Sequence, residues 1–169
     1  MTDATQKKKG PKMLWLVFAV ATCATWGLYG AFLAKGAAGF DHNRMKAFFF
    51  VGVAYVLVAI IAPAVVMLVN GDSFDFLTHP KGLKLSLFAG ILGAVGAFTA
   101  LMGLSSNPLP GPQAASQVMS VIFAGAPVVA AIYAVSQRAD GFSGLPWQFF
   151  LGLVLAAAGG ALVTLYKPA

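Results

Sequence analysis

The hydrophobic residues of this chain are gathered into long intervals that contain no ionisable side chain of the Asp, Glu, Lys, Arg or His type. These intervals are residues 13–34, 47–71, 85–137 and 141–166. About 20 apolar residues in a helix cross a hydrocarbon core of about 30 Å, so three of the intervals each suit one crossing. Helices are predicted because the intervals are apolar on all sides, whereas strands of a membrane barrel alternate apolar with polar residues.

The interval 85–137 is too long for one crossing and must fold back on itself. Its turn is predicted at 105–112, where three prolines remove backbone donors and favour extended or turn conformations. The chain is therefore predicted to be an all-α, polytopic integral membrane protein with five transmembrane helices. A polar tail, residues 1–12, would precede a membrane domain, residues 13–167, with helices at about 13–34, 47–70, 85–104, 113–137 and 146–166.

Composition and charge agree with membrane insertion. Hydrophobic residues make up 59% of the chain and charged residues 9%, against about 25% charged residues in soluble domains. The net charge of +6 does not indicate nucleic acid as a partner, because the basic residues are divided among short connectors and tails. With the amino terminus in the cytoplasm, seven basic residues lie inside and four outside. The positive-inside rule thus predicts a cell (inner) membrane protein with a cytoplasmic amino terminus.

One side of the first predicted helix is aromatic and weakly polar. At helical spacing this side carries Trp15, Phe18, Thr22, Thr25, Trp26 and Tyr29. Two interpretations are open. The side lines a substrate path, where rings and hydroxyls contact a small organic molecule, or it packs against other helices while the threonine hydroxyls bond their own backbone.

The fourth predicted helix carries the most polar patch of the five crossings, made of Gln113, Ser116, Gln117 and Ser120. An amide that faces lipid is costly, so these groups should face other helices or a hydrated cavity. Hydrogen bonding between helices would explain them, but a cavity is favoured because Pro127 would break the backbone ladder near the middle of the same helix. Pro63 is the second predicted kink.

Small residues recur at helical spacing on two further predicted helices and indicate faces for close packing in lipid. They are Gly90, Gly93 and Ala97 in the third helix, and Gly152, Ala156 and Gly160 in the fifth. No metal site or other cofactor is predicted, because no Cys/His cluster has ligand spacing. An enzyme is not expected, since no predicted span carries a His, Asp, Glu or Lys for acid–base chemistry.

The order and spacing of several motifs are similar to one five-helix half of the drug/metabolite transporter superfamily, the EamA-type repeat. The motifs are Trp26-Gly27, Arg44, Ala100-Leu101-Met102-Gly103-Leu104, Pro110, Ala114-Ala115-Ser116, Pro127, Gln148, Gly152 and Gly159. Most members have two such halves in inverted orientation, whereas this chain has one. The resemblance thus implies a homodimer, or pairing with a second half, with the substrate site at the interface. The chain departs from the family pattern because it contains no glutamate, including the Gly-Glu pair usual after the fourth helix.

All five aspartates lie outside the predicted spans, so no intramembrane carboxylate is available to bind a proton. The functional hypothesis is therefore transport of a small neutral or zwitterionic metabolite across the lipid bilayer by alternating access. The alternative is a non-transporting membrane subunit that binds a partner membrane protein through its glycine-rich helix faces.

Overall fold

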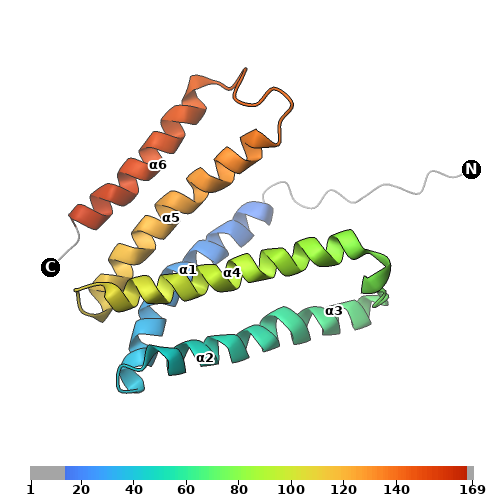
Figure 1. Cartoon of the computed structure of the whole chain (residues 1–169), viewed down its shortest axis with the longest axis horizontal. Helices are drawn as coiled ribbons and strands as arrows, with labels where there is room; N and C mark the ends of the chain where they lie inside the picture. The colour runs from blue at the N-terminus through green and yellow to red at the C-terminus, as the bar shows by residue number, and fades with distance from the viewer. Residues whose placement is uncertain (1–13, 167–169) are drawn as a thin grey trace, which may run out of the picture.

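The computed structural model describes residues 14–166, which form helices joined by short connectors. Five helices are long and apolar enough to cross a membrane, which confirms the prediction of an all-α chain with five such segments. They are α1 (Leu14–Gly39), the continuous segment Arg44–Asn70, α4 (Pro80–Ser106), α5 (Gly111–Ser136) and α6 (Trp147–Leu165) (Figure 1). The segment Arg44–Asn70 consists of α2 (Arg44–Tyr55), the π-helix η1 (Val56–Ile61) and α3 (Ala62–Asn70), and a short 3-10 helix, η2 (Phe76–Thr78), precedes α4.

The helices extend beyond the charge-free intervals. Helix α1 continues through Lys35 to Gly39, and α4 begins at Pro80 and includes Lys81 and Lys84. Long basic side chains keep their charge in water while their aliphatic stems follow the helix, so a lysine does not end a helix at the membrane surface. The predicted tail, residues 1–12, lies outside the described residues.

Local sequence signals set the turns between helices. Asn43 caps α2, because its side chain accepts a hydrogen bond from the backbone N–H of Lys46 at 3.1 Å. Gly71 ends α3 in the left-handed conformation, at a φ of 73°, which glycine adopts without a steric penalty. In the proline-rich turn, Asn107 Oδ1 accepts a hydrogen bond from the N–H of Leu109 at 3.0 Å, and α5 begins directly afterwards.

The two prolines predicted to kink helices have different surroundings. Pro63 follows the π-helix η1, at whose end the N–H of Ala62 donates to the carbonyl of Leu57, five residues earlier. Proline cannot donate to the carbonyl four residues before it, and a π turn redistributes the hydrogen bonds next to such a gap. Helix α5 instead remains an α-helix through Pro127. The distortion of the helical ladder is therefore found at Pro63.

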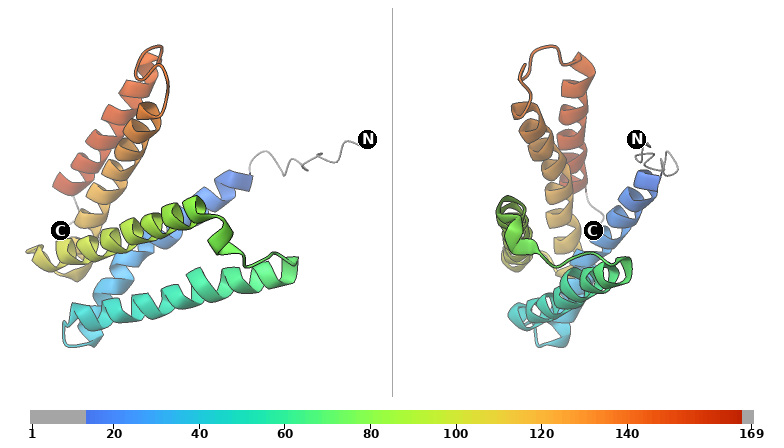
Figure 2. Two further views of the ribbon diagram at one scale, coloured as in Figure 1. Left: turned by 45° about the vertical axis from the view of Figure 1, so that its right-hand side comes forward. Right: turned by 90° about the vertical axis from the view of Figure 1, so that its right-hand side faces the viewer.

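Helices α1, α2, α4 and α5 meet at one end of the molecule, from which two arms diverge (Figures 1 and 2). One arm contains α2, α3 and α4, the other contains α5 and α6, and the first part of α1 extends separately from both (Figure 2). We call residues 30–47 and 97–119 the convergent end. It holds a core of small and branched residues: Leu33, Ala37, Ala47, Ala100, Leu101, Leu104, Ala114, Ala115 and Met119.

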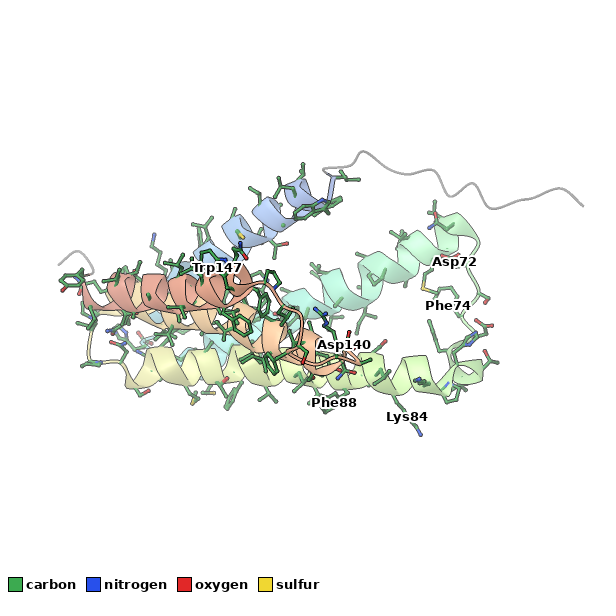
Figure 3. All side chains as sticks on the ribbon, turned by 90° about the horizontal axis from the view of Figure 1, so that it is seen from above. Asp72, Phe74, Lys84, Phe88, Asp140 and Trp147 are labelled. Carbon is green, nitrogen blue, oxygen red and sulfur yellow. The ribbon has the colours of Figure 1, made fainter. Side chains whose placement is uncertain are left out.

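We call residues 14–22 and 62–93 the open end, and none of these residues is buried. Figure 3 shows Asp72 in the connector after α3 and Lys84 near the start of α4, both far from the convergent end. Side chains of the open end, such as Phe88, project outward along the helices in the same view. Among the described residues, the fold thus has one packed end and one end at which no residue is buried.

The predicted packing faces are used in part. Gly160 of α6 lies against Ala124 of α5, where an added Cβ would lie 3.1 Å from the carbonyl oxygen of Ser120. Ala97 is buried and Ala156 is half-buried. A Cβ added at Gly90, Gly93 or Gly152 would meet no atom within 4 Å. At these three glycines there is therefore space that none of residues 14–166 fills.

Candidate functional site

A groove between α1 and the second crossing contains three of the residues predicted to contact a substrate. Its volume is about 430 Å³, and it is lined by Thr25, Trp26, Tyr29, Val51, Ala54, Tyr55 and Val58. The three predicted residues share the side of α1 that faces α2, because residues three and four apart lie on one helix face. The lining contains aromatic rings and hydroxyls but no charged side chain.

The threonines of this region are satisfied within α1. Thr22 Oγ1 donates to the carbonyl of Phe18 at 2.9 Å, and Thr25 Oγ1 approaches the carbonyls of Ala21 and Thr22 at 3.1 and 3.0 Å. Such bonds to the preceding turn are common for threonine in membrane helices. For these two hydroxyls, the structure matches the packing interpretation of the sequence.

The hydroxyl of Tyr29 differs, because it is buried and has no hydrogen-bond partner among the described residues. A buried polar group left without a partner costs roughly 1–3 kcal/mol. Tyr29 stands between α1 and α2, where it lines the groove together with Tyr55. Its hydroxyl is therefore the one buried side-chain polar group in residues 14–166 that lacks a hydrogen-bond partner.

Trp26 connects this groove to the next helix. Its ring centroid lies 5.8 Å from that of Tyr29 and 6.4 Å from that of Phe123 on α5, the latter at an interplanar angle of 82°. Edge-to-face contacts of this kind add about 0.5–1.5 kcal/mol beyond the area they bury. A shift of α5 relative to α1 would therefore move Trp26 and change the wall of the groove.

Of the polar residues predicted on α5, Gln117 lines a different pocket, of about 440 Å³, between α4, α5 and α6. Its polar lining residues are Thr99, Asn107, Gln117 and Thr164. Asn107 Nδ2 donates to Gln117 Oε1 at 2.8 Å, which links the α4–α5 turn to α5. Both threonine hydroxyls donate to carbonyls of their own helices. For Gln117, the structure contains the hydrogen bond that the packing interpretation requires.

The two predicted groups of substrate residues are not brought together. Helix α1 contacts α5 at Gly30, where an added Cβ would lie 2.7 Å from Met119 Cε and 3.5 Å from Ala115 Cβ. Gln113 and Gln117 do not lie on the face of α5 that meets α1, since each is two residues, or about 200°, from Ala115 or Met119 on that face. Ser116 is exposed, Gln113 is half-buried, and neither lines one of the two pockets. Ser120 donates to the carbonyl of Ser116 at 2.7 Å.

Sequence reasoning missed four polar residues of these pockets: Tyr55, Thr99, Asn107 and Thr164. Tyr55 lies opposite Tyr29, and an isolated tyrosine in the apolar run 47–71 was the available signal. Asn107 was assigned only to a turn, although its side chain also holds Gln117. Within residues 14–166, no group of three His, Cys, Asp or Glu side chains is placed to hold a metal ion.

The chain matches no protein-family model, no curated protein and no solved structure. The similarity to the EamA-type repeat therefore stays a prediction from the sequence.

Proposed function

We propose that this chain is a membrane transport protein for small neutral or zwitterionic molecules, and that the groove between α1 and α2 contacts the substrate. The observation that carries the proposal is the buried hydroxyl of Tyr29, which lacks a partner within the described residues. The groove has the size of a small-molecule site, since such sites span roughly 300–1,000 Å³. Tyrosine both donates and accepts, so a carbonyl, hydroxyl or amide of a substrate would satisfy it.

The substrate class follows from the charges. No ionisable residue other than tyrosine lines the groove, and Asp41, Asp72, Asp75 and Asp140 all lie on connectors between the long helices. An ion without a partner at membrane depth is strongly disfavoured. A molecule without net charge avoids this cost, and its transport would not require an intramembrane carboxylate.

A complete transporter needs a cover for the open end. The most apolar windows of Arg44–Asn70 and of α6 contain no buried residue, so much of their surface is left for lipid or another chain. We propose that a second copy, or a paired second half, packs against these faces and completes the path. Rocking of the two arms about the convergent end would then expose the groove to each side in turn.

Substitution of Tyr29 by phenylalanine tests the site. We expect uptake by proteoliposomes, assayed with labelled neutral and zwitterionic amino acids, sugars and polyols, to fall about five-fold, the loss of one hydrogen bond of about 1 kcal/mol to the substrate. Fold stability should stay equal or rise, because the substitution removes an unpartnered group. Tyr133→Phe is the matched control, since Tyr133 is 67% exposed and lines neither pocket. Wild-type uptake in Tyr29→Phe, or no uptake of any compound by the wild type, would overturn the proposal.

The unfilled space at Gly90, Gly93 and Gly152 favours a second candidate function, a non-transporting subunit that binds another membrane protein. Small residues on lipid-facing helices allow a partner's backbone to approach closely. Purification in a mild detergent decides between the two. A stoichiometric partner of different sequence, lost in Gly93→Leu, would support the subunit, and a self-associated chain that moves substrate would exclude it.

A further inference from the structure

A third pocket lies at the convergent end and differs in chemistry from the two described above. Its volume is about 230 Å³. Its apolar part is formed by residues such as Leu33, Leu101, Leu104 and Ala114, and its polar part by Lys35, His42 and Arg44. One pocket thus combines buried hydrocarbon from three helices with basic residues at the end of α1, in the α1–α2 connector and at the start of α2.

The ionisable lining of this pocket has one sign. Lysine and arginine are cationic at neutral pH, and histidine supplies at least one N–H donor. Asp41, the acidic residue of the same connector, does not line the pocket. Within residues 14–166, neither Lys35, His42 nor Arg44 forms an ion pair with a carboxylate. Among the residues that the structure describes, no carboxylate therefore neutralises the charges of Lys35 and Arg44.

The connector holds these residues in a defined place. Asn43 caps α2, so Arg44 begins that helix, and Arg44 is half-buried. Asp41 and His42 adopt left-handed backbone conformations, with φ of 53° and 62°, which turn the chain sharply between α1 and α2. Lys35 Nζ lies 5.8 Å from the centre of the Phe32 ring. Gly111 and Pro112, which begin α5, complete the wall and add the positive end of that helix dipole.

The position along the helices indicates the source of the ligand. Helix α1 ends at Gly39 and α4 at Ser106, while α2 begins at Arg44 and α5 at Gly111. The ends of membrane-spanning helices lie at the level of the lipid headgroups, and the neighbouring apolar lining reaches towards the acyl chains. A phosphate that carries acyl chains matches both parts of the pocket, and arginine binds phosphate oxygens in a bidentate manner.

We propose that this pocket binds the phosphate group of an anionic phospholipid. Lys35 and Arg44 neutralise the phosphate, His42 donates a hydrogen bond to it, and the first part of an acyl chain rests against Leu101 and Leu104. The proposal is independent of transport, because it uses a different pocket and none of the residues of the α1–α2 groove. A lipid at this place would join the connector to α4 and α5 and so fix the point from which the two arms diverge.

The test uses the full chain in nanodiscs of phosphatidylcholine with or without phosphatidylglycerol. Bound lipid is counted by native mass spectrometry, and the thermal unfolding midpoint is measured in parallel. We expect the wild type to retain phosphatidylglycerol and to unfold at a higher temperature when it is present. Lys35→Gln should weaken retention about five-fold, the effect of one basic group near a membrane surface. The double variant Lys35→Gln with Arg44→Gln should weaken it about 25-fold if the two effects multiply.

The control variant carries Lys46→Gln with Lys84→Gln, which removes the same charge from residues that do not line the pocket. Equal loss of phosphatidylglycerol in both double variants would overturn the proposal, because retention of the lipid would then depend only on the net charge of the protein. Lys35→Gln keeps the test valid if Arg44→Gln fails to fold, since Lys35 is exposed. Inorganic phosphate added to phosphatidylcholine discs forms the last arm. The same stabilisation by phosphate alone would show a free-anion site and reject the lipid.

Discussion

The convergent end and the open end are built from the same kinds of helix, yet only one of them is packed. At the convergent end, alanines such as Ala37, Ala47, Ala100 and Ala115 are buried where four helices meet. At the open end, Gly90 and Gly93 are equally small, but no atom lies within 4 Å of a Cβ added to either. Apolar composition therefore does not distinguish the two ends.

The difference shows what holds helices together in lipid. Lipid tails are as apolar as leucine, so burying a leucine against another helix gains little hydrophobic free energy. Association instead requires backbones that approach closely and short connectors that keep them together. The convergent end has both, since residues 40–43 and 107–110 join its helices directly. The open end has small residues without a neighbour, and this is the reason to expect a second chain there.

The largest effect should come from Gly160, the tightest helix contact. Alanine there places a methyl group against Ala124 and the backbone of Ser120, so α6 must move away. Overpacking of this kind costs roughly 1–3 kcal/mol. Gly159→Ala is the matched control, because no atom lies within 4 Å of its Cβ, and helix propensity alone predicts a gain of up to about 1 kcal/mol. In mixed micelles, the unfolding free energy should thus fall in Gly160→Ala and rise in Gly159→Ala. A change of the same sign in both variants would contradict the packing described.

A smaller effect is expected at Gly30, where α1 crosses α5. An added methyl group there meets the flexible side chain of Met119, which adapts more easily than a backbone. We expect Gly30→Ala to lower the unfolding free energy by about 1 kcal/mol relative to Gly27→Ala, whose Cβ meets nothing within 4 Å. The same unfolding assay measures the difference. If Gly27→Ala lowered the unfolding free energy more than Gly30→Ala, α1 would be rotated relative to α5 from the orientation described.

The hydrogen bond between Asn107 and Gln117 lies at the edge of the convergent end. Interhelical side-chain bonds in membranes average about 0.6 kcal/mol. A double-mutant cycle of Asn107→Ala and Gln117→Ala should therefore give a coupling energy near that value, while the loss of the Leu109 cap cancels within the cycle. A cycle of Asn107→Ala with Gln113→Ala should give none. Coupling in the second cycle only would show that Asn107 bonds Gln113 instead of Gln117, and would contradict the described contact.

The smallest effect lies in the connector of the open end. Ser73 Oγ donates to Asp75 Oδ1 at 2.6 Å, and this bond lowers the pKa of the Asp75 carboxyl below its usual value. Its contribution to stability is present above the ordinary aspartate pKa of about 4 and is lost as the pH falls through the lowered value. In Ser73→Ala, carbonyl NMR titration should show the pKa of Asp75 rise. Because Asp75 is fully exposed, the unfolding midpoint should hardly change.

Much of the fold could be predicted from charge and proline positions. Charge-free intervals located the five long helices, because charged groups are excluded from the hydrocarbon region. The prolines of 105–112 located the α4–α5 turn. The helix ends were harder to predict, because Lys35 and Lys84 lie inside helices that continue past the apolar interval. A charge limits the depth of a residue in the membrane and does not end its helix.

The candidate site was predictable only within each helix. Helical periodicity placed Thr22, Thr25, Trp26 and Tyr29 on one side of the helix, and the last three of these line one groove. It could not decide which helix faces that group, because crossing partners depend on contacts between distant residues. Gly30 sets the crossing of α1 and α5. Its only signal in the sequence was its four-residue spacing from Ala34, a pattern of small residues that occurs at several places in the chain.

The α4–α5 turn has a consequence for the biogenesis of the chain. In this turn Pro108, Pro110 and Pro112 have no N–H to dehydrate, and the N–H of Leu109 is already bonded to Asn107. Free backbone donors make the passage of a loop through hydrocarbon costly, and this turn presents few of them. Residues 85–137 also carry no charge to translocate. We therefore expect α4 and α5 to enter the bilayer as one preformed hairpin, tip first, with Lys84 and Arg138 remaining on the side of synthesis.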